Sequence, residues 1–137
     1  VVIEDTAELA LENPHVVRLQ TRNATADGVG AVSAQDLVRT AMRLRPDRIV
    51  MGEVRGGEVV DMLMALTSGH EGSLTTVHAR SARHALDRLV TLALRDNPQF
   101  TAGELHTLVG GAIDAVVHVD RGPLGSRRVV EVLHTRG

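Results

Sequence analysis

Short apolar segments alternate with helical patterns along most of this 137-residue chain. Strands are predicted where runs of apolar residues end at polar or turn-forming residues, at 1–3, 16–19, 49–51 and 74–77. Helices are predicted where apolar residues recur on one face or fill a whole segment, after Ser33, over 58–67, after Ser81 and after Thr101. Strands that alternate with helices form a mostly parallel sheet flanked by helices. The fold class is therefore α/β.

Two of the predicted helices begin with a recognisable cap. Asp36 follows Ser33 by three residues, and Glu104 follows Thr101 by the same interval. In a capping box of this spacing, each side chain accepts a hydrogen bond from the other residue's backbone N–H. These pairs therefore fix where the two helices start.

The C-terminal segment departs from the alternation of strands and helices. Residues 115–119 and 128–133 are both rich in valine, and the loop 121–127 between them contains glycine and proline. Two such runs joined by a short turn-forming loop predict a β-hairpin. We expect this hairpin at the edge of the sheet.

Composition excludes several classes of function. Hydrophobic residues make up 43% of the chain, and the net charge is −2, which suits one globular domain. No apolar run approaches the roughly 20 residues of a membrane span, so no transmembrane segment is predicted. Cysteine is absent, which excludes disulfides and thiolate metal sites. Phe100 is the only aromatic residue of the Phe, Tyr and Trp class, so no direct contact with nucleic acid is expected.

Acidic and polar residues follow three of the predicted strands. Glu4 and Asp5, with Glu8 nearby, follow the first strand, Glu53 follows the third and His78 follows the fourth. Ligands of parallel α/β sheets bind at the carboxyl ends of the strands. A glutamate at the tip of an apolar strand is how many nucleotide hydrolases present a carboxylate to magnesium or to the attacking water. Each acid taken alone is also typical of a solvated turn.

Two histidines flank the fourth predicted strand. His70 precedes it and His78 follows it, eight residues later. Neutral imidazoles are common zinc ligands, but this interval is not a usual zinc spacing. Contact with a phosphate, or the relay of a conformational change, fits the pair equally well.

All 15 basic residues are arginine, and lysine is absent. Arg18 and Arg22 lie about the second predicted strand, and Arg55 lies among several arginines around the third. Such arginines are either solvated surface charge or guanidinium groups that reach a phosphate, including across a subunit boundary. Chemistry that needs a lysine is excluded for these 137 residues.

Four ordered blocks of sequence together resemble a known superfamily. They read IEDTAEL at 3–9, PHVVRL at 14–19, RPDRIVMGEVRG at 45–56 and SGHEGSLTTVHA at 68–79. In this order they resemble the secretion ATPases that drive type II and type IV secretion and type IV pilus machines. The likeness is strongest to the CpaF/TadA-like branch, which powers tight-adherence pili. The resemblance implies a RecA-like P-loop NTPase core, ATP and Mg²⁺ as cofactors, and a homo-hexameric ring.

The resemblance also implies roles for the acidic residues. Glu4, Asp5 and Glu8 match the Asp box, which supports the magnesium ion and its water molecules. Glu53 matches the Walker B glutamate, which acts as a general base or orients the attacking water. Glu4, Asp5 and Glu53 would thus surround the metal. Gly52 stands where a generic Walker B element has an aspartate, as is normal in this superfamily.

The basic residues receive roles from the same resemblance. Arg18 and Arg22 match positions thought to contact the nucleotide phosphates. Arg55 would help to bind the nucleotide. The segment from His70 to His78 matches the His box, which couples the nucleotide state to domain movement.

The Walker A loop of the superfamily, Gly-x-x-x-x-Gly-Lys-[Ser/Thr], has no match in this sequence. We expect it upstream of Val1, so that residues 1–137 are a single fragment of the C-terminal RecA-like domain. Backbone amides and the lysine of that loop supply much of the phosphate affinity of P-loop proteins. The fragment alone is therefore expected to bind ATP poorly and to hydrolyse it negligibly.

Two other functions stay open from the sequence. One is a non-catalytic module for ring assembly, and the other is a metal-dependent hydrolase that uses His70, His78 and Glu53. For the motor, the resemblance implies inner-membrane platform proteins of a secretion or pilus system as partners. It also implies a cytoplasmic location at the inner face of the plasma membrane.

Overall fold

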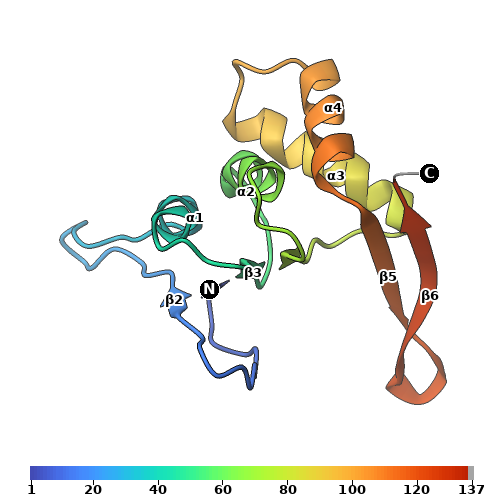
Figure 1. Ribbon diagram of the computed structural model, residues 1–137, viewed down its shortest axis with the longest axis horizontal. Helices are drawn as coiled ribbons and strands as arrows, with labels where there is room; N and C mark the ends of the chain where they lie inside the picture. Colours follow the sequence, from blue (N-terminus) through green and yellow to red (C-terminus); the bar gives the residue numbers. More distant parts are fainter. Residues whose placement is uncertain (136–137) are drawn as a thin grey trace.

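The computed structural model describes residues 1–135 and contains one parallel sheet, the helices that pack on it and a separate hairpin (Figure 1). The sheet has four short strands, β1 (Val2–Glu4), β2 (Arg18–Gln20), β3 (Val50–Met51) and β4 (Leu74–Thr75). Their order is β2-β1-β3-β4, and every pair is parallel. Because the pairs are parallel, the carboxyl ends of all four strands lie at one edge, as the sequence predicted.

β1 lies inside the sheet although it comes first in the chain. Ile3 pairs with Leu19 of β2 on one side and with Met51 of β3 on the other. All three residues of β1 are buried. Glu4 and the segment after β3 are therefore neighbours at the carboxyl edge.

The predicted helices are confirmed, with bounds close to those expected. They are α1 (Ala34–Arg43), α2 (Glu58–Thr67), α3 (Ala82–Asp96) and α4 (Ala102–Ala112). Ser33 and Thr101 form the two predicted capping boxes with Asp36 and Glu104, and Ser81 caps α3 through the N–H of His84.

α2 is the central helix of the core. It packs against α1 on one side and against α3 and α4 on the other (Figure 1). Burial on most sides explains why its sequence is apolar nearly all round rather than on one stripe. The side chains of Ile49, Met62, Leu63 and Leu105 are fully buried here. The core is aliphatic, as the composition requires.

The predicted hairpin is present, but it is not an edge of the parallel sheet. β5 (Ala115–Arg121) and β6 (Arg127–His134) pair with each other in an antiparallel, two-stranded sheet of their own. The hairpin packs on α3, and the carboxylate of Glu131 accepts a hydrogen bond from the backbone N–H of Ala82. This contact with α3, rather than a strand partner, fixes its position. In the described part of the chain, no helix is long and apolar enough to cross a membrane.

Candidate active site

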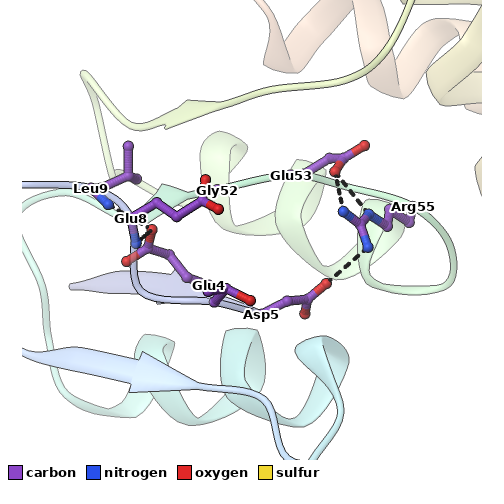
Figure 2. A pocket seen from close by; sticks show the side chains of 8 residues that line it. Glu4, Asp5, Glu8, Leu9, Gly52, Glu53 and Arg55 are labelled. Carbon is purple, nitrogen blue, oxygen red and sulfur yellow. Dashed lines mark hydrogen bonds and ion pairs between the residues drawn. The ribbon is translucent and has the colours of Figure 1, made fainter.

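A pocket of about 170 Å³ lies where β1 and β3 end. Its lining comes from the segments that follow these two strands: Glu4, Asp5, Thr6, Glu8, Leu9, Gly52, Glu53 and Arg55. Figure 2 shows the acidic side chains and Arg55 gathered around it. We call it the acidic pocket. It brings together five of the residues that the sequence singled out.

Glu4 is buried, and neighbouring groups of the protein contact its carboxylate. Its Oε1 accepts hydrogen bonds from the backbone N–H groups of Glu8 and Leu9, both at 2.9 Å (Figure 2). Its Oε2 lies 3.9 Å from Nη1 of Arg18. Only 7% of the residue is exposed. Glu4 therefore holds the segment 5–9 in place against β1.

Arg55 joins the two acidic segments across the pocket. Its Nη2 lies 2.6 Å from Oε2 of Glu53, and its Nη1 lies 3.3 Å from Oδ2 of Asp5 (Figure 2). The hydrogen bond and the charge of Glu53, followed by the charge of Asp5, raise the pKa of the Arg55 guanidinium above its ordinary value. The Arg55 side chain is 65% exposed, so a ligand in solution has access to it.

The other oxygen of Glu53 contacts a residue that follows β4. Nε2 of His78 lies 3.1 Å from Oε1 of Glu53, and the His78 side chain is 92% exposed. Glu53 thus has one oxygen on Arg55 and the other on His78. Its carboxylate is oriented from both sides, at the mouth of the acidic pocket.

Gly52 permits the close approach of β3 to β1. The N–H of Gly52 donates to the carbonyl of Ile3 at 2.8 Å, and a Cβ at position 52 would lie 3.3 Å from Cγ of Glu4. That separation is tighter than most real Cβ contacts, so the Glu4 side chain would have to give way. An aspartate at position 52 would therefore disturb Glu4, which gives a physical reason for glycine here.

Besides His78, three residues predicted for the site lie outside the lining. Arg18 lies behind the pocket, next to the lining residue Glu4. Its Nη1 donates to the carbonyl of Leu9 at 2.7 Å. Arg22 donates from Nε to the carbonyl of Gly30 and stays on that loop. Nδ1 of His70 lies 3.0 Å from the carbonyl of Ala65 at the end of α2.

The two histidines lie at opposite ends of β4. His70 comes before the strand, at its amino end, and His78 comes after the strand, at its carboxyl end. The two imidazoles therefore do not share one cluster with Glu53. This placement gives no support to a zinc hydrolase built on the three residues.

The sequence did not point to Glu58, Arg95 or Asp96. The buried carboxylate of Glu58 accepts hydrogen bonds from the backbone N–H groups of Arg55 and Gly56. A usable signal was present, because a glutamate directly after two glycines and before an apolar helix suits the first helical turn. Arg95 and Asp96 carried no such signal, since they contact the same turn from the far end of α3.

The acidic residues suit a magnesium ion that arrives bound to a phosphate better than a metal ion held by protein side chains alone. Within residues 1–135, no group of three or more His, Asp or Glu side chains is arranged to hold a metal ion. Magnesium is typically bound by one or two carboxylates together with water and substrate phosphates. Asp5 and Glu53 supply carboxylate oxygens of that kind at the pocket.

Comparisons with known proteins show the family of this chain. The type II/IV secretion system protein family matches residues 1–119. A putative conjugal transfer protein of Mycobacterium tuberculosis is 46% identical over 132 residues, covering 96% of this chain and 37% of that protein. The type IV secretion system protein PtlH of Bordetella pertussis is 42% identical, covering all of this chain and 42% of that protein.

A solved structure resembles the fold closely. The crystal structure of the VirB11 ATPase of the Brucella suis type IV secretion system superposes with a TM-score of 0.83 and 33% identity, over 97% of this chain and 39% of that one. The chain thus spans about two fifths of the length of the relatives it matches. The more specific likeness to the tight-adherence branch stays a prediction. The chain belongs to the type II/IV secretion system protein family, within the superfamily of secretion ATPases.

Proposed function

We propose that this chain supplies the acidic part of the ATP-hydrolysing site of a hexameric type II/IV secretion motor. The observation that carries the proposal is the position of Glu53. Its carboxylate stands at the end of a core strand, beside Asp5 and Arg55, at the mouth of the acidic pocket. The similarity to a structure described as a VirB11 ATPase supports the same reaction.

Glu53 is placed to orient a water molecule for attack on a terminal phosphate and to accept its proton. For this it needs a free oxygen, whereas both of its oxygens are held by Arg55 and His78 in this structure. The exposed guanidinium of Arg55 is free to turn from Glu53 towards a phosphate. Such a movement releases Oε2 of Glu53 for the water.

The acids around Glu53 have different tasks in this proposal. Asp5 and Glu53 hold Mg²⁺, directly or through water, and Glu8 lines the same pocket. Glu4 keeps the segment 5–9 in place, because its Oε1 already accepts two backbone hydrogen bonds. When bound with ATP, the magnesium ion offsets the negative charge that develops on the phosphoryl oxygens.

The remaining residues act at longer range. Arg18 supports the pocket through Glu4, and Arg22 lies on an exposed loop that a neighbouring subunit of the ring can approach. An arginine that reaches the phosphates from a neighbour contributes roughly 10³–10⁵-fold in rate. His78 contacts the carboxylate of Glu53 and therefore responds when that carboxylate moves. His70 belongs to the turn between α2 and β4.

The motor acts in this proposal at the cytoplasmic face of the inner membrane, on platform proteins of a secretion or pilus system. Residues 1–137 contain no Walker A loop. We therefore expect residues 1–137 alone to bind MgATP weakly. Isothermal titration tests this directly, and a micromolar dissociation constant would contradict it.

The test of the proposed site is Glu53→Gln in the complete protein that carries this chain. Losing the carboxylate base lowers kcat by about 10²-fold or more, because general-base catalysis contributes roughly 10²–10⁴-fold. Nucleotide binding is retained, since the amide is isosteric. The matched control is Glu12→Gln, an exposed acid that does not line the pocket. If Glu53→Gln hydrolyses ATP as fast as the control, the assignment is wrong and a non-catalytic role in ring assembly takes its place.

A further inference from the structure

The turn that carries Arg55 is held by hydrogen bonds to the helix that follows it. The N–H groups of Arg55 and Gly56 donate to Oε1 of Glu58, and the N–H of Val59 donates to the carbonyl of Gly56. These bonds come from α2, which directly follows the turn. We call residues 55–57 the Arg55 turn.

A second set of bonds reaches the Arg55 turn from a distant part of the chain. Nη2 of Arg95 donates to the carbonyl of Arg55 at 2.9 Å, across forty residues of sequence. Asp96 lies beside the same turn, where a Cβ at Gly57 would be 3.5 Å from Cβ of Asp96 and 3.9 Å from its Oδ2. Both residues belong to the last turn of α3.

Arg95 and Asp96 also hold each other. Nε and Nη2 of Arg95 contact the two carboxylate oxygens of Asp96 at 3.2 and 3.0 Å. The bond and charge of Asp96 raise the pKa of Arg95, and the bond to Arg95 lowers the pKa of Asp96, so both groups are charged near neutral pH. A two-point ion pair of this kind has a fixed geometry. We call the pair the α3 clamp.

Gly56 shows how closely the α3 clamp sits on the turn. A Cβ at position 56 would lie 2.8 Å from Nη2 of Arg95 and 2.8 Å from Oδ2 of Asp96. These distances are shorter than real Cβ contacts, so a side chain here would displace the clamp. Because glycine has no side chain, position 56 leaves room for the α3 clamp to lie against the turn.

We infer that Arg95 and Asp96 are positioning residues that hold the main chain of the Arg55 turn beside the acidic pocket, so that the Arg55 side chain reaches Glu53 and Asp5 and can turn from there to a phosphate. The clamp bonds to the carbonyl of Arg55 and lies against Gly56, and the guanidinium of Arg55 reaches both acids from that main chain. A small displacement of a catalytic group costs up to about 10²-fold in rate. The inference rests on the proposed function, and it links the C-terminal end of α3 to the acidic pocket.

The test uses Arg95→Ala and Asp96→Ala in the complete protein, with Arg88→Ala as the control. Arg88 is an exposed arginine of the same helix and has no contact with the Arg55 turn among the interactions described for residues 1–135. Arg95→Ala is expected to lower kcat for ATP about tenfold or more, with KM changed less than about threefold. Arg95→Lys, which keeps a donor for the Arg55 carbonyl, is expected to restore part of the rate. The control keeps the rate of the unmodified protein.

Amide hydrogen exchange gives a readout that does not depend on activity. Exchange at Gly57 is expected to rise at least about tenfold in Asp96→Ala but not in Arg88→Ala, because Arg95 loses the carboxylate that fixes it on the Arg55 carbonyl and the turn opens more often. Unchanged exchange at Gly57 overturns the clamp. Faster exchange with unchanged kcat shows that the clamp orders the turn without serving catalysis, and this also overturns the inference.

A double variant separates the clamp from the proposed function. If the clamp acts through Arg55, adding Arg95→Ala to Arg55→Ala lowers kcat little further, so the two losses are not additive. Fully additive losses overturn the inference while leaving the role of Glu53 intact. If Glu53→Gln keeps full activity but Gly57 still loses protection in Asp96→Ala, the proposed function fails while the contact stands.

Discussion

Replacing Glu4 with alanine tests whether this acid is a structural element of the site. The change removes two hydrogen bonds, each 2.9 Å long, from the backbone N–H groups of Glu8 and Leu9 to a buried carboxylate. Bonds to a charged group contribute about 1.5–3 kcal/mol each, and the lower figure applies here because both amides are only partly buried. We therefore expect Glu4→Ala to lower the free energy of unfolding by about 3 kcal/mol.

Urea unfolding followed by circular dichroism measures this loss. With a slope of about 2 kcal/mol per molar urea, a loss of about 3 kcal/mol lowers the midpoint by about 1.5 M. Glu4→Gln is the matched control, since its carbonyl oxygen still accepts both N–H groups, and it is expected to lose only about 1 kcal/mol. A midpoint for Glu4→Ala equal to that of Glu4→Gln would refute the structural role of Oε1.

Three further predictions concern stability. The bonds from Thr101, the backbone N–H first and then the hydroxyl, lower the pKa of Glu104. The stability that Glu104 contributes is therefore present above its ordinary pKa and is lost as the pH falls through the lowered value. Glu104→Gln, which does not titrate, should flatten this acid limb of a melting-temperature profile, and an unchanged limb counts against the capping box. Leu105→Ala empties a fully buried position and is expected to cost about 2–5 kcal/mol in urea unfolding, whereas a loss below about 1 kcal/mol would contradict its place in the core. Gly72→Ala meets a φ of +74° and Nε of Arg48 at 2.8 Å, so its melting temperature should drop, while Gly103→Ala, where nothing lies within 4 Å, should not destabilise.

Local sequence patterns were sufficient to predict the helices and the position of the main site. Ser33 and Thr101 mark helix starts through contacts with residues three positions away, so the whole signal lies within one turn. Glu4 and Glu53 end apolar strands, and parallel pairing brings strand ends to one edge whatever the order of the strands. The acidic pocket follows from these two facts.

Features that depend on contacts between distant segments were not predictable in the same way. Arg95 and Asp96 act on the Arg55 turn, and nothing near them in the sequence indicates that contact. The hairpin was expected at the sheet edge because its valines suit a strand, but packing on α3 decides its place.

The position of β1 inside the sheet has a consequence for when the acidic pocket forms during folding. Glu4 and Glu53 come close only after the intervening chain has closed into a loop that includes β2 and α1. Such closure costs entropy before any long-range contact offsets it. In a chain that is still emerging from the ribosome, or in one whose β3 has separated from β1, Glu4 and Glu53 therefore lie far apart and the pocket is absent. The acidic pocket thus forms together with the finished sheet, and a half-folded chain lacks it.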